Sequence, residues 1–171
     1  MQDIYTYTVP VFIKMLGGLK NILAKAESYA REHKMDDSRL LSDAIIFDMF
    51  PLVKQVQVAC DNAKSATARL AGIEAPKYED SEKTFAELSA RIDTTVAFLQ
   101  SVPEVSFADA ATRQVTMPFF PGKYMTGFDY AREYAIPNFF FHLTTAYDIV
   151  RKNGVPIGKS DFTVTLPLKD L

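Results

Sequence analysis

The two side chains best placed to do chemistry together are Asn138 and His142, four residues apart in the segment 135–149. A helix is predicted there, and this spacing puts both side chains on one helix face, one turn apart. The same face carries apolar residues, so it should point at a core. Polar groups directed inward need partners, and the pair therefore predicts a small polar pocket around His142.

Asp48 is the third candidate residue for this pocket. Carboxylate, amide and imidazole groups together would favour Mn or Mg over Zn, because oxygen ligands suit harder cations. Simpler interpretations stay open: Asp48 suits a helix N-cap, His142 suits a hydrogen-bonded core histidine, and the three groups could satisfy one another. We favour these interpretations, expect no bound metal or other cofactor, and assign no catalytic residue.

The remaining reactive side chains favour structural roles. His33 falls at the end of the first predicted helix and reads as a surface histidine. Cys60 lies in an apolar stripe and should behave as a small core hydrophobe. A single cysteine excludes a disulfide within the chain and a cysteine-rich metal site. The sequence contains no Walker-type loop, dinucleotide fingerprint, Gly-x-Ser-x-Gly elbow or His-Glu-x-x-His motif.

Composition indicates an ordinary globular protein of 171 residues, with 48% hydrophobic and 23% charged residues. The net charge of −2 and the lack of a basic stripe argue against nucleic acid and anionic membranes as partners. The N-terminus does not have the pattern of a signal peptide, and charged residues interrupt every long apolar stretch. A bacterial-type cytoplasmic setting is the default expectation.

Apolar residues recur at three- and four-residue steps in four segments, each of which predicts an amphipathic helix. In the third, Thr84 and Glu87 form a capping-box pattern, and Gly72 should end the second. Gly17-Gly18 interrupts the first helix, either as a tolerated weakness or as a close approach of another backbone. The predicted helices are 4–32, 48–71, a third from Thr84 to just before Pro103, and 127–152 with a bend near Pro137.

Between the third and fourth helices the pattern is not helical. Residues 114–117 and 123–126 flank Pro121-Gly122, a pair that suits the centre of a type II turn, so a short hairpin is predicted. The tail, 155–171, alternates polar and apolar residues and could form an extended arm against the bundle or a partner subunit. Four apolar stripes are most simply buried in an all-α four-helix bundle with long connections, forming one domain over residues 1–171.

The order of helices, the hairpin before the fourth helix and the ending Arg151-x-x-Gly154 resemble the DinB/YfiT-like four-helix-bundle superfamily. The segments 48–52, 83–88 and 137–142 resemble an uncharacterised bacterial branch of it, a domain of unknown function. The superfamily implies a divalent metal held by three histidines, one from the start of the second helix and a His-x-x-x-His pair on the fourth. Here Asn138 and His142 occupy the pair, and residues 48–51 contain no histidine.

These observations favour an uncharacterised bundle protein without a complete metal site, with a small pocket near His142. One alternative is a metal-dependent hydrolase or thiol transferase of the superfamily's kind, using Asp48, Asn138 and His142. Another is a small-ligand binding or sensor protein that uses the aromatic residues near His142. Phe139, Phe140 and Phe141 point in three directions around a helix, so one or two of them should be covered by a subunit interface or by the hairpin. A homodimer is expected.

Overall fold

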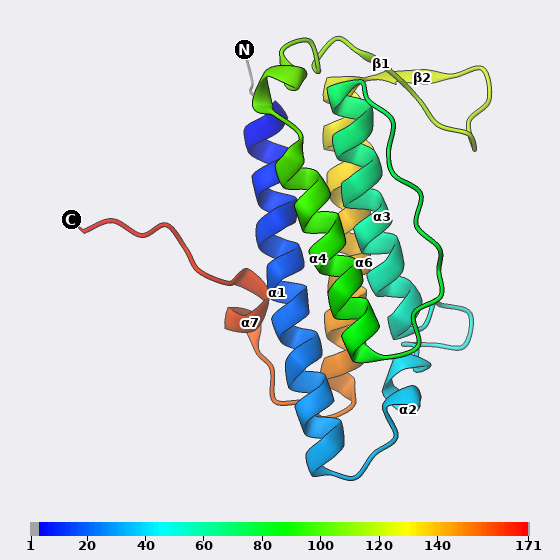
Figure 1. The fold of residues 1–171 in the computed structure, drawn as a ribbon, viewed down its shortest axis with the longest axis vertical. Coiled ribbons are helices and arrows are strands. Elements are labelled where there is room, and N and C mark those ends of the chain that lie inside the picture. The colour runs from blue at the N-terminus through cyan, green and yellow to red at the C-terminus, as the bar shows by residue number, and fades with distance from the viewer. Residues whose placement is uncertain (1–3, 171) are drawn as a thin grey trace.

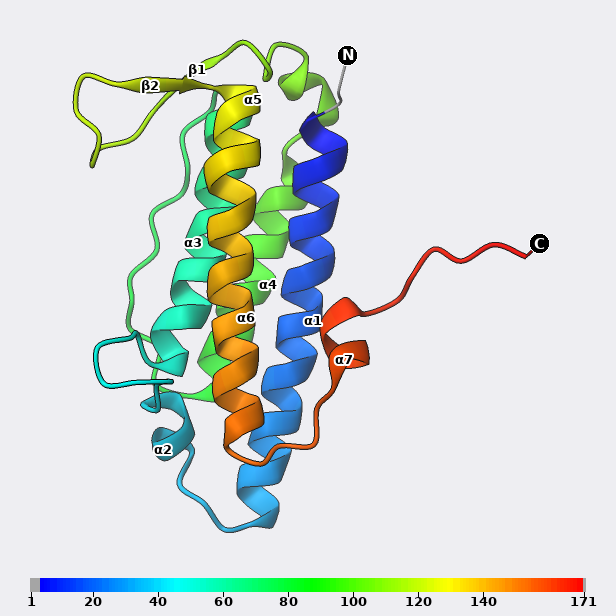
Figure 2. The ribbon, with the colours of Figure 1, turned by 180° about the vertical axis from the view of Figure 1, so that it is seen from behind.

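The computed structural model describes residues 4–170. Within them, four long helices lie side by side as a bundle (Figures 1 and 2). They are α1 (Ile4–Glu32), α3 (Leu52–Ala71), α4 (Phe85–Ser101) and α6 (Ile136–Lys152). α3 and α1 each pack against both α4 and α6. The predicted all-α four-helix bundle is confirmed; residues 1–3 and 171, at the ends of the predicted domain, lie outside the described residues.

The predicted stripes form the core. Leu16, Leu19 and Leu23 of α1 are each no more than 1% exposed, and Val56, like Ile92, meets them from the facing helices. Burying one such side chain contributes about 1.5–3 kcal/mol, so the pooled stripes are the main force that holds the helices together. Cys60 is fully buried in the same core, as predicted.

α3 begins later than predicted. Its N-cap is Pro51, in an extended conformation, and Asp48 lies exposed in the preceding loop without capping the helix. The predicted cap was wrong because a proline disfavours the helical conformation in the residue before it, which here is Phe50. The loop follows a short helix, α2 (Asp37–Leu41), whose N-cap Asp36 accepts a hydrogen bond from the backbone of Ser38.

Two other helix ends were predicted correctly from local sequence signals. Thr84 caps α4, and its side chain and that of Glu87 bond each other's backbone N–H in the predicted capping box. Gly72 ends α3 with φ 73°, a left-handed conformation that glycine adopts without steric cost. Cap geometry is fixed by neighbours in the sequence, which explains why it could be predicted.

The predicted fourth helix is built in three pieces. α5 (Gly127–Asp129) leads into a π-helical segment, η2 (Tyr130–Ala135), which leads into α6. Pro137 stands at the beginning of α6, where its missing N–H cannot serve the carbonyl one turn earlier. The predicted disturbance near Pro137 is therefore present as a widened π turn directly before it.

The hairpin is confirmed. A short 3-10 helix, η1 (Glu104–Phe107), precedes β1 (Gln114–Thr116), which pairs antiparallel with β2 (Tyr124–Thr126). At the turn, Lys123 N donates to Phe120 O at 3.2 Å, and Gly122 has φ 74°. A positive φ at the residue after Pro121 is the type II geometry that the Pro-Gly pair predicts.

The tail is only partly the extended arm that its alternation suggested. Residues Lys159–Thr163 form a short helix, α7, that lies against α1 (Figures 1 and 2). A Cβ atom on Gly18 would lie 2.6 Å from Val164 Cγ2, whereas one on Gly17 would meet nothing within 4 Å. The glycine pair thus includes one position where another segment approaches closely. No helix among residues 4–170 is both long and apolar enough to cross a membrane.

Candidate functional site

The inward-facing imidazole of α6 meets a glutamine of α3. His142 is 8% exposed and Gln55 is 1% exposed. His142 Nδ1 lies 2.8 Å from Gln55 Oε1, which joins two residues 87 positions apart in the sequence. The bond joins α3 to α6 and holds the side chains of Gln55 and His142 in fixed orientations.

The glutamine determines which ring nitrogen of His142 carries the proton. Gln55 Nε2 donates to the carbonyl oxygen of Phe50 at 3.0 Å, so Gln55 Oε1 must face the imidazole. A carbonyl oxygen can only accept, so His142 Nδ1 is the protonated nitrogen that donates to it. The lone pair of His142 is therefore on Nε2.

Burial favours the neutral imidazole as well. The pKa of His142 lies below its usual value of 6.5 because burial disfavours the charged ring. Within residues 4–170, Nε2 of His142 makes no hydrogen bond, while Nδ1 is held by Gln55. His142 thus presents one unprotonated nitrogen that can accept a hydrogen bond or a proton.

One aromatic side chain packs against this imidazole, and two others are exposed in the loop before α3. The ring of Phe141 packs edge-on to His142 with centroids 5.2 Å apart, and Phe141 is 55% exposed. Phe50, whose carbonyl orients Gln55, is 51% exposed, and Phe47 of the same loop is 94% exposed. We call Phe47, Phe50 and Phe141 the aromatic rim. Exposed large aromatic side chains near a polar anchor are typical of binding surfaces.

The other two predicted pocket residues take no part in this hydrogen-bond pair. Asn138 is half-buried on α6, one turn before His142, and Asp48 is exposed in the loop before α3. No hydrogen bond within residues 4–170 joins either of them to His142; the partner of His142 is Gln55. The three predicted residues do not satisfy one another in the polar network that we had favoured.

Gln55 was missed by the sequence analysis, although a signal was present. It follows Leu52 by three residues, so it lies on the same inward stripe of α3 as Leu52 and Val56. An amide on an apolar stripe is the same signal that singled out Asn138. Applied to the second helix as well as the fourth, it would have identified Gln55.

The residues present do not fit the three-histidine metal site that the superfamily implies. Among residues 4–170, no three His, Cys, Asp or Glu side chains gather closely enough to hold an ion. The second histidine of the chain, His33, stacks on Tyr29 and its Nδ1 lies 2.9 Å from Tyr29 O, at the end of α1. A tight site needs three or four convergent ligands, and His142 supplies one.

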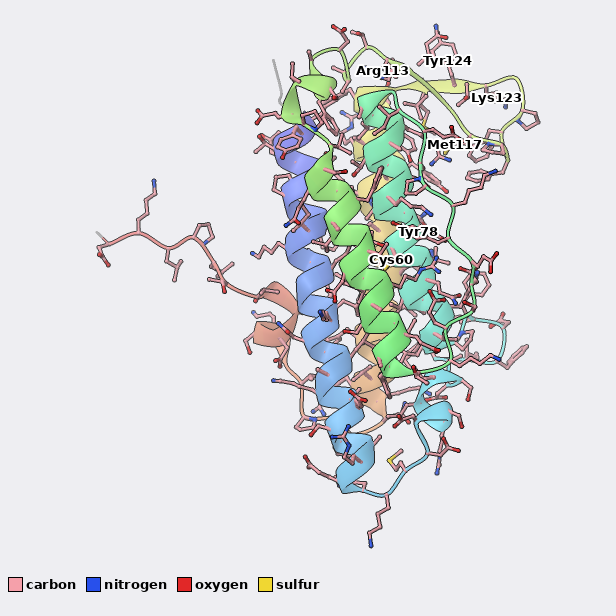
Figure 3. The ribbon with its side chains drawn as sticks, in the orientation of Figure 1. Cys60, Tyr78, Arg113, Met117, Lys123 and Tyr124 are labelled. Carbon is pink, nitrogen blue, oxygen red and sulfur yellow. The ribbon has the colours of Figure 1, made fainter. Side chains whose placement is uncertain are left out.

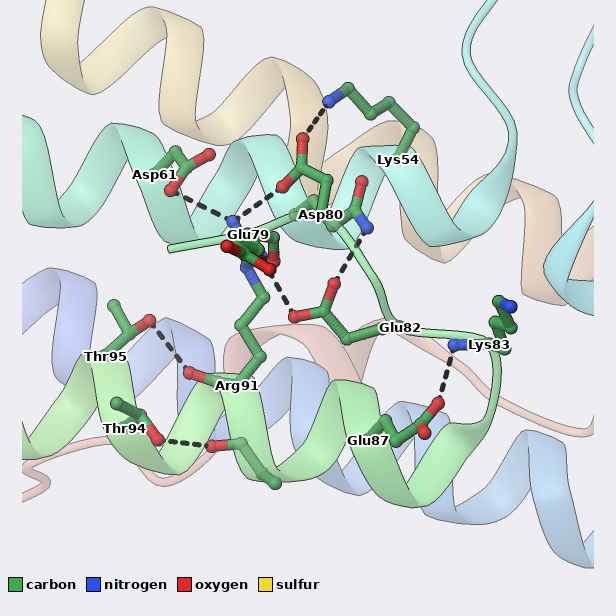
Figure 4. A network of polar contacts seen from close by, with 12 residues as sticks. Lys54, Asp61, Glu79, Asp80, Glu82, Lys83, Glu87, Arg91, Thr94 and Thr95 are labelled. Atoms are coloured by element: carbon green, nitrogen blue, oxygen red, sulfur yellow. Dashed lines mark hydrogen bonds and ion pairs between the residues drawn. The ribbon is translucent and has the colours of Figure 1, made fainter. Parts of the chain in front are cut away.

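A second polar cluster lies between α3, α4 and the loop that joins them (Figure 4). The Arg91 side chain, 2% exposed, lies 3.0 Å from both Asp61 and Asp80 and 2.9 Å from Glu82. We define the Arg91 cluster as these residues with the two lysines that pair with its carboxylates: Lys54, Asp61, Lys64, Asp80, Glu82 and Arg91.

The Arg91 cluster is balanced in charge, with one cation for each carboxylate. Burial opposes ionisation of both carboxyls, but Lys54 and then Arg91 hold the pKa of Asp80 below its usual range, and hydrogen bonds from Arg91 and Gln57 do the same for the pKa of Glu82. Tyr78 lies over Lys64 and Arg91, and Cys60 lies nearby (Figure 3). Burial raises the pKa of Cys60 to about 12, so this thiol is not a nucleophile at neutral pH.

Comparisons with known proteins agree with the predicted resemblance. Residues 4–163 match the family described as "Domain of unknown function (DUF1993)". The crystal structure of a DinB family member protein from Shewanella denitrificans is similar to this one, with a TM-score of 0.94 and 47% sequence identity over 98% of this chain and 95% of that chain. A search of curated proteins gave no match. The chain belongs to this family of unknown function, and its fold is that of a DinB-like helical bundle.

Proposed function

We propose that this protein binds a small, uncharged organic molecule at His142, and that Nε2 of His142 accepts a hydrogen bond from the ligand. The observation that carries this proposal is the fixed orientation of Gln55, which puts the proton of His142 on Nδ1. The role is binding, in keeping with the absence of any assigned catalytic residue.

The surroundings indicate the class of ligand. Phe141 offers an exposed aromatic ring against the imidazole, and Phe50, whose carbonyl oxygen bonds Gln55, is exposed in the loop before α3. A ligand with an apolar ring and one hydroxyl or amide N–H would match these faces and the single acceptor. A charged ligand is disfavoured, because His142 is neutral at pH 7 and offers no compensating charge.

The alternative of a metal-dependent hydrolase or thiol transferase ranks second. One observation favours it: metal-binding histidines commonly donate their second ring N–H to a carbonyl oxygen, as His142 does to Gln55. The donor set opposes it, because Asp48 and Asn138 would have to move toward His142 to complete even a three-ligand site. Elemental analysis of the purified protein tests this alternative directly.

A thermal-shift measurement with matched probes tests the binding proposal. We expect benzyl alcohol and benzamide to raise the melting temperature, because a ligand that binds only the folded state stabilises it. Benzyl methyl ether has the same ring and no donor, so it should have a smaller effect. Equal shifts for all three probes would contradict the role of Nε2.

The His142→Asn variant is the matched control. An asparagine amide placed where Nδ1 now lies can still donate to Gln55 Oε1, but it has no atom at the position of Nε2. The variant should therefore fold and lose the difference between benzyl alcohol and its methyl ether. If the variant retains that difference, the hydrogen bond is made elsewhere and the proposal fails.

We also propose the expected homodimer. In the single chain Phe139 is fully buried, Phe140 is half-buried against it, and Phe141 remains 55% exposed. A second copy that covers Phe141 would bury the aromatic side chain that the bundle leaves out, and it would compete with the ligand proposed at His142 for this ring. Light scattering at micromolar concentration tests this, and a monomeric mass would contradict it.

A further inference from the structure

Two hollows lie at the hairpin, at the end of the bundle near Arg69 of α3. Figure 3 labels Met117, Lys123 and Tyr124, which line both of them. One, of about 590 Å³, is lined by Arg69 of α3 together with residues of the hairpin. The other, of about 250 Å³, is lined by hairpin residues that include Val115 and Met125. Met117, Phe120, Lys123 and Tyr124 line both hollows, so the two are neighbours at the hairpin. Hollows of this size fit a small organic molecule.

The larger hollow is bordered by cations without acidic partners. Arg69 and Lys123 line it, and no Asp or Glu is among its described lining residues. Within residues 4–170, neither cation forms an ion pair, and the same is true of Arg113, whose guanidinium lies over Gly72 close by. In contrast, Arg132, which precedes α6, is paired with carboxylates of its own segment. Unpaired cations around one hollow attract an anion.

Arg69 is held in place by a side chain other than a carboxylate. Its Nη1 donates to the hydroxyl of Tyr130 at 3.1 Å, and Tyr130 is fully buried. This bond fixes the guanidinium at the edge of the hollow and leaves its other N–H groups without a partner in the described part of the chain. A planar guanidinium with free donors is well suited to carboxylate or phosphate oxygens.

The smaller hollow has the opposite character. Val115 and Met117, 3% and 5% exposed, form its floor, while Phe120 and Tyr124 border it with exposed rings. An aromatic ring would fit this hollow through apolar and ring-to-ring contact. Lys123 lies at the junction, where it reaches both the ring and an attached anionic group.

We propose that the hairpin end of the bundle is a second binding site, separate from His142, for a small aromatic molecule that carries a carboxylate or a phosphate. The ring occupies the smaller hollow, and the anionic group is bound by Lys123 and Arg69 at the larger one. The inference does not depend on the function proposed for His142, because it uses none of the same residues.

Calorimetric titration of the full chain tests the proposal, with benzoate and phenyl phosphate as the probes. Both should bind, more weakly at high salt, and the tighter of the two identifies the anionic group. Phenol carries the ring without the charge, and inorganic phosphate carries the charge without the ring. Measured in the His142→Asn variant, which lacks the acceptor proposed for a hydroxyl-bearing ring, each should bind at least about tenfold more weakly than phenyl phosphate. If either one binds as tightly as phenyl phosphate, the two-part site is wrong.

Lys123→Met is the decisive variant, because Lys123 is exposed and its loss should not prevent folding. We expect it to weaken the binding of phenyl phosphate by about tenfold, the usual effect of removing one charged hydrogen bond. Lys169→Met in the exposed tail makes the same change in net charge and should have no effect. Equal affinities for the two variants would overturn the site, and His142→Asn should leave the binding of phenyl phosphate unchanged.

Discussion

The two buried polar clusters of the bundle differ in how completely their groups are paired. In the Arg91 cluster every charge has an opposite charge within 3.0 Å, and the cluster ties the loop after α3 to α4. In the pair formed by His142 and Gln55, one nitrogen of the imidazole has no partner within residues 4–170. Both clusters join α3 to a neighbouring helix, yet their unbonded atoms differ: Arg91 Nε is a buried N–H donor, whereas His142 Nε2 is a lone-pair acceptor on a ring that is 8% exposed.

The difference teaches how to read polar groups in a helical core. A buried cation that is surrounded by its own carboxylates indicates a role in stability, even where one of its N–H groups, here Arg91 Nε, makes no hydrogen bond. A buried group that is oriented by one hydrogen bond and has a second polar atom without a partner indicates a role in ligand binding. By this criterion Arg91, although it is the more heavily charged, is structural, and His142 is the functional candidate.

The largest effect should come from Arg91→Met. Its removal leaves Asp61, Asp80 and Glu82 close together without their shared cation, and Glu82 is largely buried. Breaking a buried ion pair from one side is strongly destabilising, so the free energy of unfolding should fall by about 3 kcal/mol. Urea denaturation at pH 7 measures it.

The matched control for Arg91→Met is Lys20→Met. Lys20 pairs with Asp93 at 2.6 Å, but both side chains are exposed, by 39% and 60%. Exposed pairs contribute about 0–1 kcal/mol, so this variant should be close to the parent protein. If the two variants lost equal stability, the Arg91 cluster would not be the structural element that we describe.

Features that depend on residues close together in the sequence could be predicted from it. The capping box at Thr84 and Glu87 was predictable because its partners are three residues apart. The start of α3 was not, because Asp48 and Pro51 give competing local signals and the proline prevails. No local signal joins Arg91 to its carboxylates, which lie 9 to 30 residues away in the sequence, or joins Gln55 to His142 across 87 residues.

The second prediction concerns the glutamines of α3. Gln55→Leu removes the acceptor for His142 Nδ1 and the donor for Phe50 O, and should lower the free energy of unfolding by about 1–2 kcal/mol. It should also release the tautomer of His142, which ¹⁵N chemical shifts of the ring report. Gln57→Leu is the control: Gln57 donates to Glu82 in the Arg91 cluster, so its loss should leave those shifts unchanged.

The third prediction is that the two clusters lose their contributions to stability in different pH ranges. Because the pKa of His142 is lowered on folding, the unfolded chain binds the proton more readily between that lowered pKa and 6.5. The stability that the neutral ring contributes is complete above pH 6.5 and is lost as the pH falls through this window. Compared with His142→Asn, the parent protein should therefore lose stability between pH 7 and pH 5. The loss should be smaller than the losses expected for Arg91→Met and Gln55→Leu.

The carboxylates of the Arg91 cluster respond in a lower window. The pKa values of Asp80 and Glu82 lie below their ordinary values of 3.8 and 4.5, so their contribution is present above those values and is lost as the pH falls below them. Urea denaturation at several pH values can therefore distinguish the contributions of the two clusters to the free energy of unfolding. A difference between the parent protein and His142→Asn that stayed constant from pH 7 to pH 5 would contradict the lowered pKa of His142.

The smallest effect should come from Lys54→Met at the edge of the Arg91 cluster. Lys54 pairs with Asp80, but the two side chains are 35% and 37% exposed, and Asp80 keeps its second partner, Arg91 Nη2, at 3.0 Å. The loss in the free energy of unfolding should be about 0.5 kcal/mol. Both Lys54→Met and Arg91→Met remove one positive charge, so a general charge effect would lower their stability equally. A much larger loss for Arg91→Met would instead show that the buried guanidinium stabilises the cluster.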